Sequence, residues 1–156
     1  MTAQISIRKA ELKDVGTIAR FNAAMAEETE HIQLDMDRLQ QGVEGLLNAP
    51  MYGVYILAEV NGTTVGQTMI TYEWSDWRNG LFWWIQSVYV LPNYRTQGVF
   101  RALYNFTLDL AQRQKNVCGL RLYVDKENER AYHIYRKLGM KETAYKMLEV
   151  DFVLHR

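Results

Sequence analysis

Apolar residues recur at helical spacing in the first third of the chain. Ile18, Phe21 and Met25 fall on one face of a helix that we expect to begin near Asp14. A second apolar stripe follows Asp35, a residue type that favours the N-cap position because its carboxylate accepts hydrogen bonds from free backbone N–H groups. The pattern therefore predicts two amphipathic helices in succession.

Strand patterns flank these helices. Ile5 and Ile7 alternate with polar neighbours, and two longer apolar runs are separated by Asn61-Gly62, a pair that tolerates the positive φ angles of a tight hairpin turn. A nearly all-apolar run then ends at Pro92, which is typical of a strand buried on both faces. We expect strands at residues 54–60, 64–72 and 81–91, and a polar loop at residues 73–80.

The last third predicts a crossover and a closing segment. A helix follows the loop at residues 93–98, a strand is expected at 120–124, and a second helical stripe runs from Ala131 to Leu138, with Gly139 as its C-terminal glycine. Residues 143–153 read as one or two closing strands. The order of elements predicts a mixed α+β sheet.

Composition restricts the class of protein. A chain of 156 residues fits one domain, residues 1–156, and 18 basic residues balance 18 acidic ones. Zero net charge argues against binding to nucleic acid or to an anionic membrane surface, since both favour excess positive charge. A single cysteine and the lack of an apolar leader favour a cytoplasmic location.

The segment from Val88 to Tyr104 is a candidate anion site. A buried strand ends there, a short loop carries Arg95 and Gly98, and a helix begins. The first turn of a helix offers unpaired N–H groups and the positive end of the helix dipole, and phosphate is the usual ligand. Neither nucleotide-binding glycine motif is present. Taken alone, one glycine before a helix is more often a simple turn.

Two segments in this order carry a specific resemblance. The first matches V-x-V-x-P-x-x-R-x-x-G-x-[GA], and the second, from Asn128 to Met140, matches N-x-x-A-x-x-x-Y-x-K-x-G-[FM]. Together they resemble the GNAT superfamily of acetyl-CoA-dependent N-acetyltransferases, and the stretch from Thr71 to Gly139 is most similar to diamine and polyamine acetyltransferases. The resemblance implies an α+β, three-layer fold with a mixed, mostly antiparallel sheet of six to seven strands and four flanking helices.

The resemblance also implies the cosubstrate and its site. Acetyl-CoA would bind along a bulged central strand that splays from its parallel neighbour, and its pyrophosphate would lie on the start of the following helix, with no metal involved. The implied contacts are Val88, Tyr89, Val90, Arg95, Thr96, Gln97, Gly98, Val99, Phe100, Arg101, Asn128, Ala131 and Tyr135. Phe100 departs from the family pattern, which has Gly or Ala there, and this puts the detailed pyrophosphate fit in doubt.

The implied chemistry is direct attack of an amine on the thioester. Tyr135 is the expected general acid for the leaving thiolate, and a backbone N–H near Val88 is the expected oxyanion donor. Many family members carry a glutamate base on the central strand, where this chain has Gln86, which does not accept a proton usefully. The remaining candidate bases are Glu28, Glu73 and Asp76, or a water chain.

Charge and aromatic residues suggest the acceptor. Six acidic residues and one basic residue lie between Ala26 and Gly45, and Trp74 and Trp77 accompany carboxylates near residue 75. Both features suit a small cationic amine, such as a polyamine, diamine or amino-acid-like amine. Exposed tryptophans are also typical of interfaces, so we expect a homodimer. Two alternatives remain open: acetylation of a protein or peptide amine, and a non-catalytic acyl-CoA-binding sensor.

Overall fold

The computed structural model describes residues 4–154. They divide into two compact units, and the boundary along the chain falls between residues 122 and 123. The first unit contains the sheet and most of the helices. Its elements are β1 (Ile5–Lys9), η1 (Leu12–Asp14), α1 (Val15–Glu30), α2 (Met36–Asn48), β2 (Gly53–Val60), β3 (Thr63–Ser75), β4 (Gly80–Val90), η2 (Pro92–Tyr94), α3 (Val99–Gln112) and β5 (Val117–Arg121). The second unit contains α4 (Glu129–Lys137).

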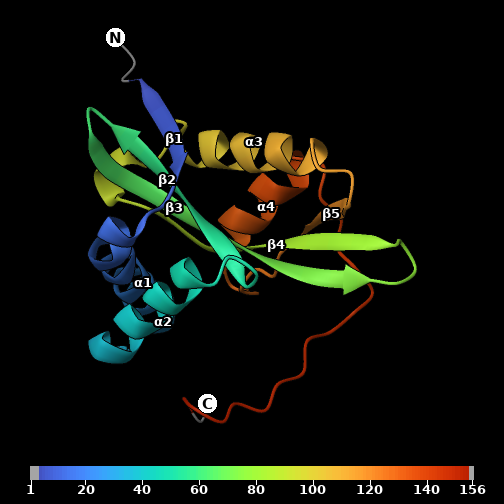
Figure 1. Ribbon diagram of the computed structural model, residues 1–156, viewed down its shortest axis with the longest axis horizontal. Coiled ribbons are helices and arrows are strands. Elements are labelled where there is room, and N and C mark those ends of the chain that lie inside the picture. The colour runs from blue at the N-terminus through green and yellow to red at the C-terminus, as the bar shows by residue number, and fades with distance from the viewer. Residues whose placement is uncertain (1–3, 155–156) are drawn as a thin grey trace. The chain divides into compact units, whose positions relative to one another are not determined.

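The five strands form one sheet in the order β1-β2-β3-β4-β5 (Figure 1). The first four are antiparallel neighbours, and β5 returns through α3 to pair parallel with β4. This confirms the predicted mixed, mostly antiparallel sheet and the predicted crossover. Four α-helices are present in residues 4–154, as expected, but the sheet has five strands rather than six or seven.

Helices cover both faces of the sheet in the first unit (Figure 1). On one face, Ile18 of α1 and Val43 of α2 pack against Tyr55 and Leu57 of β2. On the other face α3 lies so close to β3 that a side chain at Gly66 would collide with Val99 of α3. Burying apolar side chains on both faces accounts for the continuous apolar runs of the central strands.

Local signals placed several element ends correctly. Asp35 caps α2, and its side chain accepts hydrogen bonds from the N–H groups of Asp37 and Arg38. The hairpin turn between β2 and β3 has φ angles of 52° at Asn61 and 78° at Gly62. Both angles are positive, as a tight turn of this kind requires.

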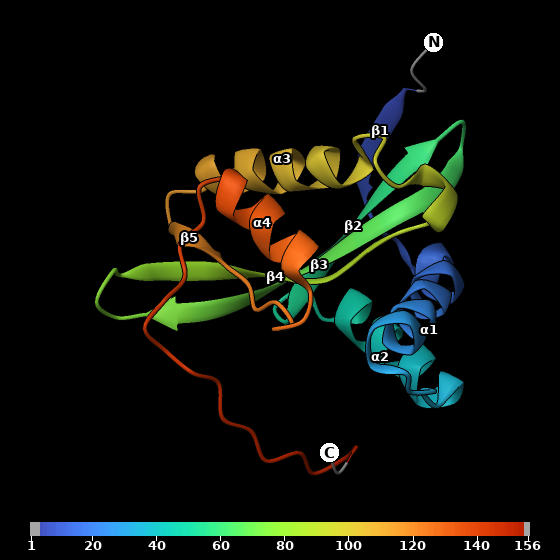
Figure 2. The same ribbon diagram turned by 180° about the vertical axis from the view of Figure 1, so that it is seen from behind.

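The prediction of a loop over residues 73–80 was wrong for half of its length. The ladder between β3 and β4 continues through Glu73↔Phe82 to Ser75↔Gly80, so only four residues form the turn. Cross-strand contacts extend the pairing, since the Trp84 indole N–H donates to the Glu73 carboxylate. Figure 2 shows the resulting hairpin reaching past β1 and β2.

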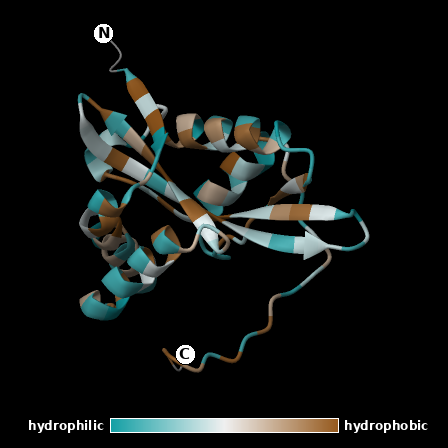
Figure 3. Ribbon diagram, in the orientation of Figure 1, coloured by the Kyte–Doolittle hydropathy of each residue, from teal (hydrophilic) through white to brown (hydrophobic). Residues whose placement is uncertain are grey.

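Two strand predictions near the C-terminus also need correction. β5 starts three residues before the expected position, because Leu81 pairs with Val117 and Gly119 allows the Phe82 ring to approach. Residues 143–153 form no strand, since no ladder involves them in the described chain. Figure 3 shows hydrophobic and hydrophilic residues following one another along this C-terminal segment. An apolar pattern is not enough for a strand, because a strand forms only where its backbone groups pair with a neighbouring strand.

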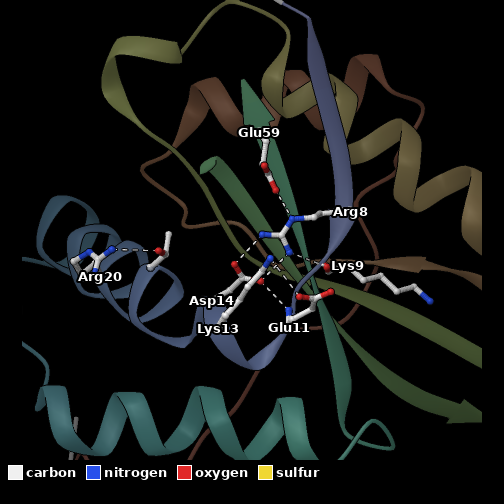
Figure 4. Close-up of polar contacts among 8 residues, drawn as sticks. Arg8, Lys9, Glu11, Lys13, Asp14, Arg20 and Glu59 are labelled. Carbon is white, nitrogen blue, oxygen red and sulfur yellow. Dashed lines mark hydrogen bonds and ion pairs between the residues drawn. The ribbon is translucent and has the colours of Figure 1, made fainter. Parts of the chain in front are cut away.

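A partly buried ion-pair cluster fixes the start of α1 (Figure 4). The Arg8 guanidinium donates two hydrogen bonds of 2.8 Å to the Asp14 carboxylate, and its Nε contacts Glu59 of β2. Asp14 also accepts from the backbone N–H of Glu11. These contacts join β1, β2 and the first turn before α1. No helix in residues 4–154 has both the length and the apolar character needed to cross a membrane.

Candidate functional site

The central strand β4 carries a bulge where the resemblance predicts one. Gln67 of β3 pairs with Tyr89, but Met69 pairs with Gln86, so Ser87 and Val88 together face one residue of β3. Ser87 has a φ of 53°, an uncommon angle for a residue other than glycine. The bulge therefore changes the direction of the peptide groups at the middle of the sheet.

One flank of β4 is unpaired beside this bulge. β5 pairs with β4 only from Leu81 to Trp84. In the described chain, no strand lies on that side of residues 85–90. The backbone of Val88 and Val90, which the resemblance assigns to the coenzyme arm, belongs to this unpaired stretch.

The loop after β4 leads into α3 through two residues with left-handed backbone. Thr96 has a φ of 63°, and Gly98, the residue before α3, has a φ of 87°. The first hydrogen bond of the helix joins the Ala102 N–H to the Gly98 carbonyl. The N–H groups of residues 99–101 precede it and point out of the start of the helix, which is the arrangement that binds anions.

The predicted residues of this loop do not all face an anion site. The Arg95 side chain turns back, since its Nε donates to the Val90 carbonyl at 2.8 Å and its Nη2 donates to Glu28 at 2.8 Å. The Gln97 side chain donates to the carbonyl of Asn93, and the Thr96 hydroxyl contacts the carbonyl of Arg95. Their side chains shape the loop, whereas the side chain of Arg101 in the first turn of α3 is exposed.

Phe100 packs along α3 and against the sheet. Its ring lies 6.2 Å from the ring of Tyr104, one helical turn later. It also lines a small cavity with Thr68, Ile85 and Val88, on the α3 side of the bulge. The bulky side chain that replaces the family's Gly or Ala thus lies between α3 and the sheet.

Glu28, one candidate base, is held at the end of α1. Its carboxylate binds Arg95 and accepts from the Tyr89 hydroxyl at 3.2 Å. Burial and the neighbouring Glu28 carboxylate raise the pKa of Tyr89, so the phenol is a donor at neutral pH. The Tyr89 ring lies beneath the Arg95 guanidinium, 5.5 Å away, and packs against Phe21 of α1.

Glu73, the second candidate base, lies on the extended hairpin. It accepts from Arg121 at 2.6 Å and from the Trp84 indole at 3.2 Å. The Arg121 guanidinium also stacks 3.6 Å from the centre of the Phe82 ring. Gln86 of β4 donates to the Thr71 hydroxyl of β3 at 2.7 Å. This part of the sheet combines aromatic rings with a half-exposed carboxylate.

The hairpin tip places the remaining candidates at the surface. Asp76 lies in the turn between β3 and β4, beside Trp77, which is 84% exposed. Trp74, at 60% exposure, is the second-last residue of β3. The aromatic residues that suggested cation binding or an interface are therefore accessible.

The second unit carries the other sequence motif on α4. Asn128 caps this helix, and its side-chain oxygen accepts from the Ala131 N–H at 3.2 Å. Tyr135 lies one turn beyond Ala131, near the end of the helix. After α4 the backbone turns at Gly139, which has a φ of 94°, as the predicted C-terminal glycine requires.

Sequence reasoning missed a buried polar group beside the bulge. Gln67 of β3 is completely buried and contacts Asn22 of α1 and the backbone of Ser87. The available signal was a single amide side chain in a strand whose adjacent residues are buried. A metal-binding cluster is not found in residues 4–154, where no three His, Cys, Asp or Glu side chains lie close enough together to bind one ion.

Comparison with protein families gives one assignment for this geometry. Residues 18–140 match the model of the acetyltransferase (GNAT) family. The match includes the bulged strand, the loop before α3, and α4. Both motif segments therefore lie inside the matched region.

Individual relatives support the same assignment. A possible acetyltransferase from Clostridium difficile 630 has a structure with a TM-score of 0.89 and 47% identity, covering 96% of this chain and 98% of that one. A thialysine N-epsilon-acetyltransferase from Bos taurus is 26% identical over 151 residues, which is 90% of this chain and 86% of the relative. A spermidine N(1)-acetyltransferase from Escherichia coli K12 is 40% identical over 52 residues, 33% of this chain and 28% of the relative.

Proposed function

The chain belongs to the GNAT acetyltransferase family and is an acetyl-CoA-dependent N-acetyltransferase, and we propose that its acceptor is the amine of a small cationic molecule. A polyamine, a diamine and an amino-acid-like amine are the acceptor types that we propose. The observation that carries the proposal is the Glu73 carboxylate on the β3–β4 hairpin, which is half-exposed and bound by the Trp84 indole and by Arg121. A carboxylate beside an aromatic ring suits an ammonium group.

The coenzyme would use backbone groups of the first unit. Its arm would lie along the unpaired flank of β4 at Val88 and Val90, and its pyrophosphate would lie on the N–H groups that open α3. Gly98 fits this role, because its backbone angle favours glycine and no atom lies within 4 Å of a side chain built there. Arg101 would add positive charge at the same turn.

The acceptor side is acidic. The end of α1 and the start of α2 carry exposed carboxylates, among them Glu27, Glu30 and Asp37. A surface of one charge sign attracts ligands of the opposite sign and raises their rate of association. Two of the similar proteins are named for amine substrates, thialysine and spermidine, and each of these amines carries positive charge at neutral pH.

The reaction joins the acceptor nitrogen to the acetyl carbon and breaks the thioester C–S bond. The Val88 N–H would stabilise the charge that develops on the carbonyl oxygen. Glu73 would accept one proton from the ammonium group, directly or through water, and Tyr135 would donate its phenolic proton to the sulfur. The second proton that the nitrogen loses on becoming an amide would restore the phenol of Tyr135. Glu28 remains the other candidate base, and its carboxylate binds Arg95 and Tyr89 much as that of Glu73 binds Arg121 and Trp84.

Release of the coenzyme thiol, measured against a panel of amines, tests the proposal. We expect turnover with spermidine, diamines and thialysine, and little with peptides. Turnover with peptides alone would instead make the chain a peptide N-acetyltransferase. Tight acetyl-CoA binding by calorimetry without transfer to any acceptor would make it an acyl-CoA sensor. The single cysteine fits the reducing cytoplasm in which we place this reaction.

A further inference from the structure

A buried amide holds the bulge of β4 from one side. The Gln67 Nε2 group donates to the Ser87 carbonyl at 3.1 Å and to Asn22 Oδ1 at 2.8 Å. Gln67 is 0% exposed and Asn22 is 7% exposed. Through these two bonds, one side chain of β3 connects α1 to the residue with the unusual φ angle.

The orientation of the Gln67 amide is determined by its partners. Both contacts are acceptor oxygens, so only the NH₂ end of the amide satisfies them. A rotation that exchanged the nitrogen and oxygen would place three oxygens against one another. Asn22 is in turn held by the hydroxyl of Tyr55, whose phenol has a pKa raised by burial.

The amide is satisfied at one end only. The Gln67 Oε1 atom is buried and has no hydrogen-bond partner in the described chain. The NH₂ end satisfies two buried acceptors, the Ser87 carbonyl and Asn22 Oδ1. Methionine has a similar shape but no donor, so it would leave both acceptors without this partner. The amide at this position therefore has a local role, which is to hold the Ser87 carbonyl and Asn22.

The geometry of one peptide bond explains what the amide controls. The Ser87 carbonyl and the Val88 N–H belong to the same planar group, and residues 4–154 contain no cis peptide. In a trans peptide these two groups point in opposite directions. Because Gln67 holds the carbonyl, the Val88 N–H must point away from Gln67 and Asn22. Next to this peptide, on the side of β4 opposite β3, is the flank that β5 leaves unpaired, and an N–H turned away from Gln67 would be available to a group bound there.

We propose that Gln67 is a positioning residue, which fixes the Ser87–Val88 peptide so that the Val88 N–H faces the thioester carbonyl of acetyl-CoA. This inference rests on the proposed function, because it assumes that acetyl-CoA binds along the unpaired flank. Gln67 touches neither the coenzyme nor the acceptor. It acts by preventing rotation of the peptide that supplies the oxyanion donor, and Asn22 fixes Gln67 in turn.

The test compares Gln67→Met with a control of matched burial. Asp14→Asn is the control, since it also weakens the hydrogen bonds of a buried polar side chain in the first unit, but on η1 and not beside β4. Each protein is loaded with acetyl-CoA that carries ¹³C in the thioester carbonyl. The carbonyl stretch of the bound thioester is read by isotope-edited infrared spectroscopy, the dissociation constant by calorimetry, and kcat and KM by thiol release.

We expect Gln67→Met to bind acetyl-CoA within about twofold of wild type while kcat falls about 10- to 100-fold. The carbonyl stretch should move back toward its frequency in free acetyl-CoA, because the hydrogen bond from Val88 is weakened. Asn22→Ala, which leaves the Gln67 bond to Ser87 in place, should give a smaller change in the same direction. Asp14→Asn should leave the stretch unchanged.

An unchanged carbonyl stretch in a folded Gln67→Met protein would overturn the inference, as would a loss of kcat equal to that of Asp14→Asn. If Gln67→Met does not fold, an unchanged stretch in Asn22→Ala serves as the refuting result. The infrared readout needs bound acetyl-CoA but no acceptor, so it also decides the case in which wild type transfers to no amine. Failure of wild type to bind acetyl-CoA would remove both the inference and the proposed function.

Discussion

The Arg95 guanidinium donates to the Glu28 carboxylate at 2.8 Å, across 67 residues of sequence. This bond joins the end of α1, on the acidic side of the molecule, to the loop that leads into α3. Both side chains are about 40% exposed, so the pair contributes at most about 1 kcal/mol to stability. Its consequence is geometric, because Arg95 also donates to the Val90 carbonyl at the end of β4.

Replacing Glu28 by glutamine should therefore weaken coenzyme binding more than chemistry. Without the carboxylate, Arg95 loses the partner that fixes its side chain, and the loop before α3 becomes less ordered. We expect KM for acetyl-CoA to rise about 2- to 10-fold, kcat to change by less than about twofold, and the free energy of unfolding to fall by less than about 1 kcal/mol. Steady-state kinetics and urea unfolding measure these quantities.

Glu27→Gln is the matched control, since Glu27 is exposed on the adjacent position of α1. It should change none of the three quantities. A different result for Glu28→Gln would reassign the residue: a collapse of kcat, with loss of the acidic limb of the pH profile, would identify Glu28 as the general base instead of a loop-positioning group.

Signals that act over a few residues predicted much of the fold. Asp35 caps α2, and Asn61-Gly62 makes the first hairpin turn, because capping and positive φ depend on the residue types at the site. The end of β3 depends instead on cross-strand pairing with β4, and residues 143–153 have a strand pattern without a ladder. Pairing is a non-local property, so the apolar pattern alone misplaced both.

The residues of the candidate site also fall into two groups, those that local sequence predicts and those that depend on distant contacts. The loop before α3 and its glycine could be predicted, since strand, turn and helix signals follow one another in 17 residues of sequence, Val88 to Tyr104. The contact of Gln67 with Asn22 spans 45 residues, and its effect on Ser87 depends on a register shift between two strands. No local pattern encodes either. The contacts with the longest sequence separation are the ones that only the structure revealed.

Tyr135→Phe tests the proposed general acid. Phenylalanine lacks the phenolic proton of tyrosine and changes the shape of the side chain little. We expect kcat to fall about 100- to 10,000-fold, with acetyl-CoA affinity unchanged. Tyr132→Phe is the control on the same helix, where the hydroxyl donates to Glu142. Equal turnover of wild type and Tyr135→Phe at every pH would remove Tyr135 from the mechanism.

The exposed hairpin tip predicts self-association. Trp77 is 84% exposed and Trp74 is 60% exposed, and buried tryptophans often dominate the binding energy of interfaces. We expect wild type to sediment as a dimer at micromolar concentration, and the double variant Trp74→Ala/Trp77→Ala to raise the dimer dissociation constant at least 30-fold. Tyr52→Ala, an exposed aromatic residue away from the hairpin tip, is the control. A monomer mass for wild type across this concentration range would count against the interface.

The Arg8–Asp14 pair predicts how stability depends on pH. Hydrogen bonds from Arg8 hold the pKa of Asp14 below its ordinary value, against the opposing effect of burial. The folded state therefore favours the ionised carboxylate, and its contribution is complete above the unfolded pKa of about 3.9 and is lost as pH falls through the lower folded value. Asp14→Asn should cost about 1–3 kcal/mol at pH 7 and progressively less below pH of about 4, as measured by urea unfolding. Glu11→Gln, at an exposed pair with Lys13, should cost less than about 0.5 kcal/mol at either pH. A cost for Asp14→Asn that stays constant from pH 7 to pH 3 would show that lost packing, and not the ion pair, sets its effect.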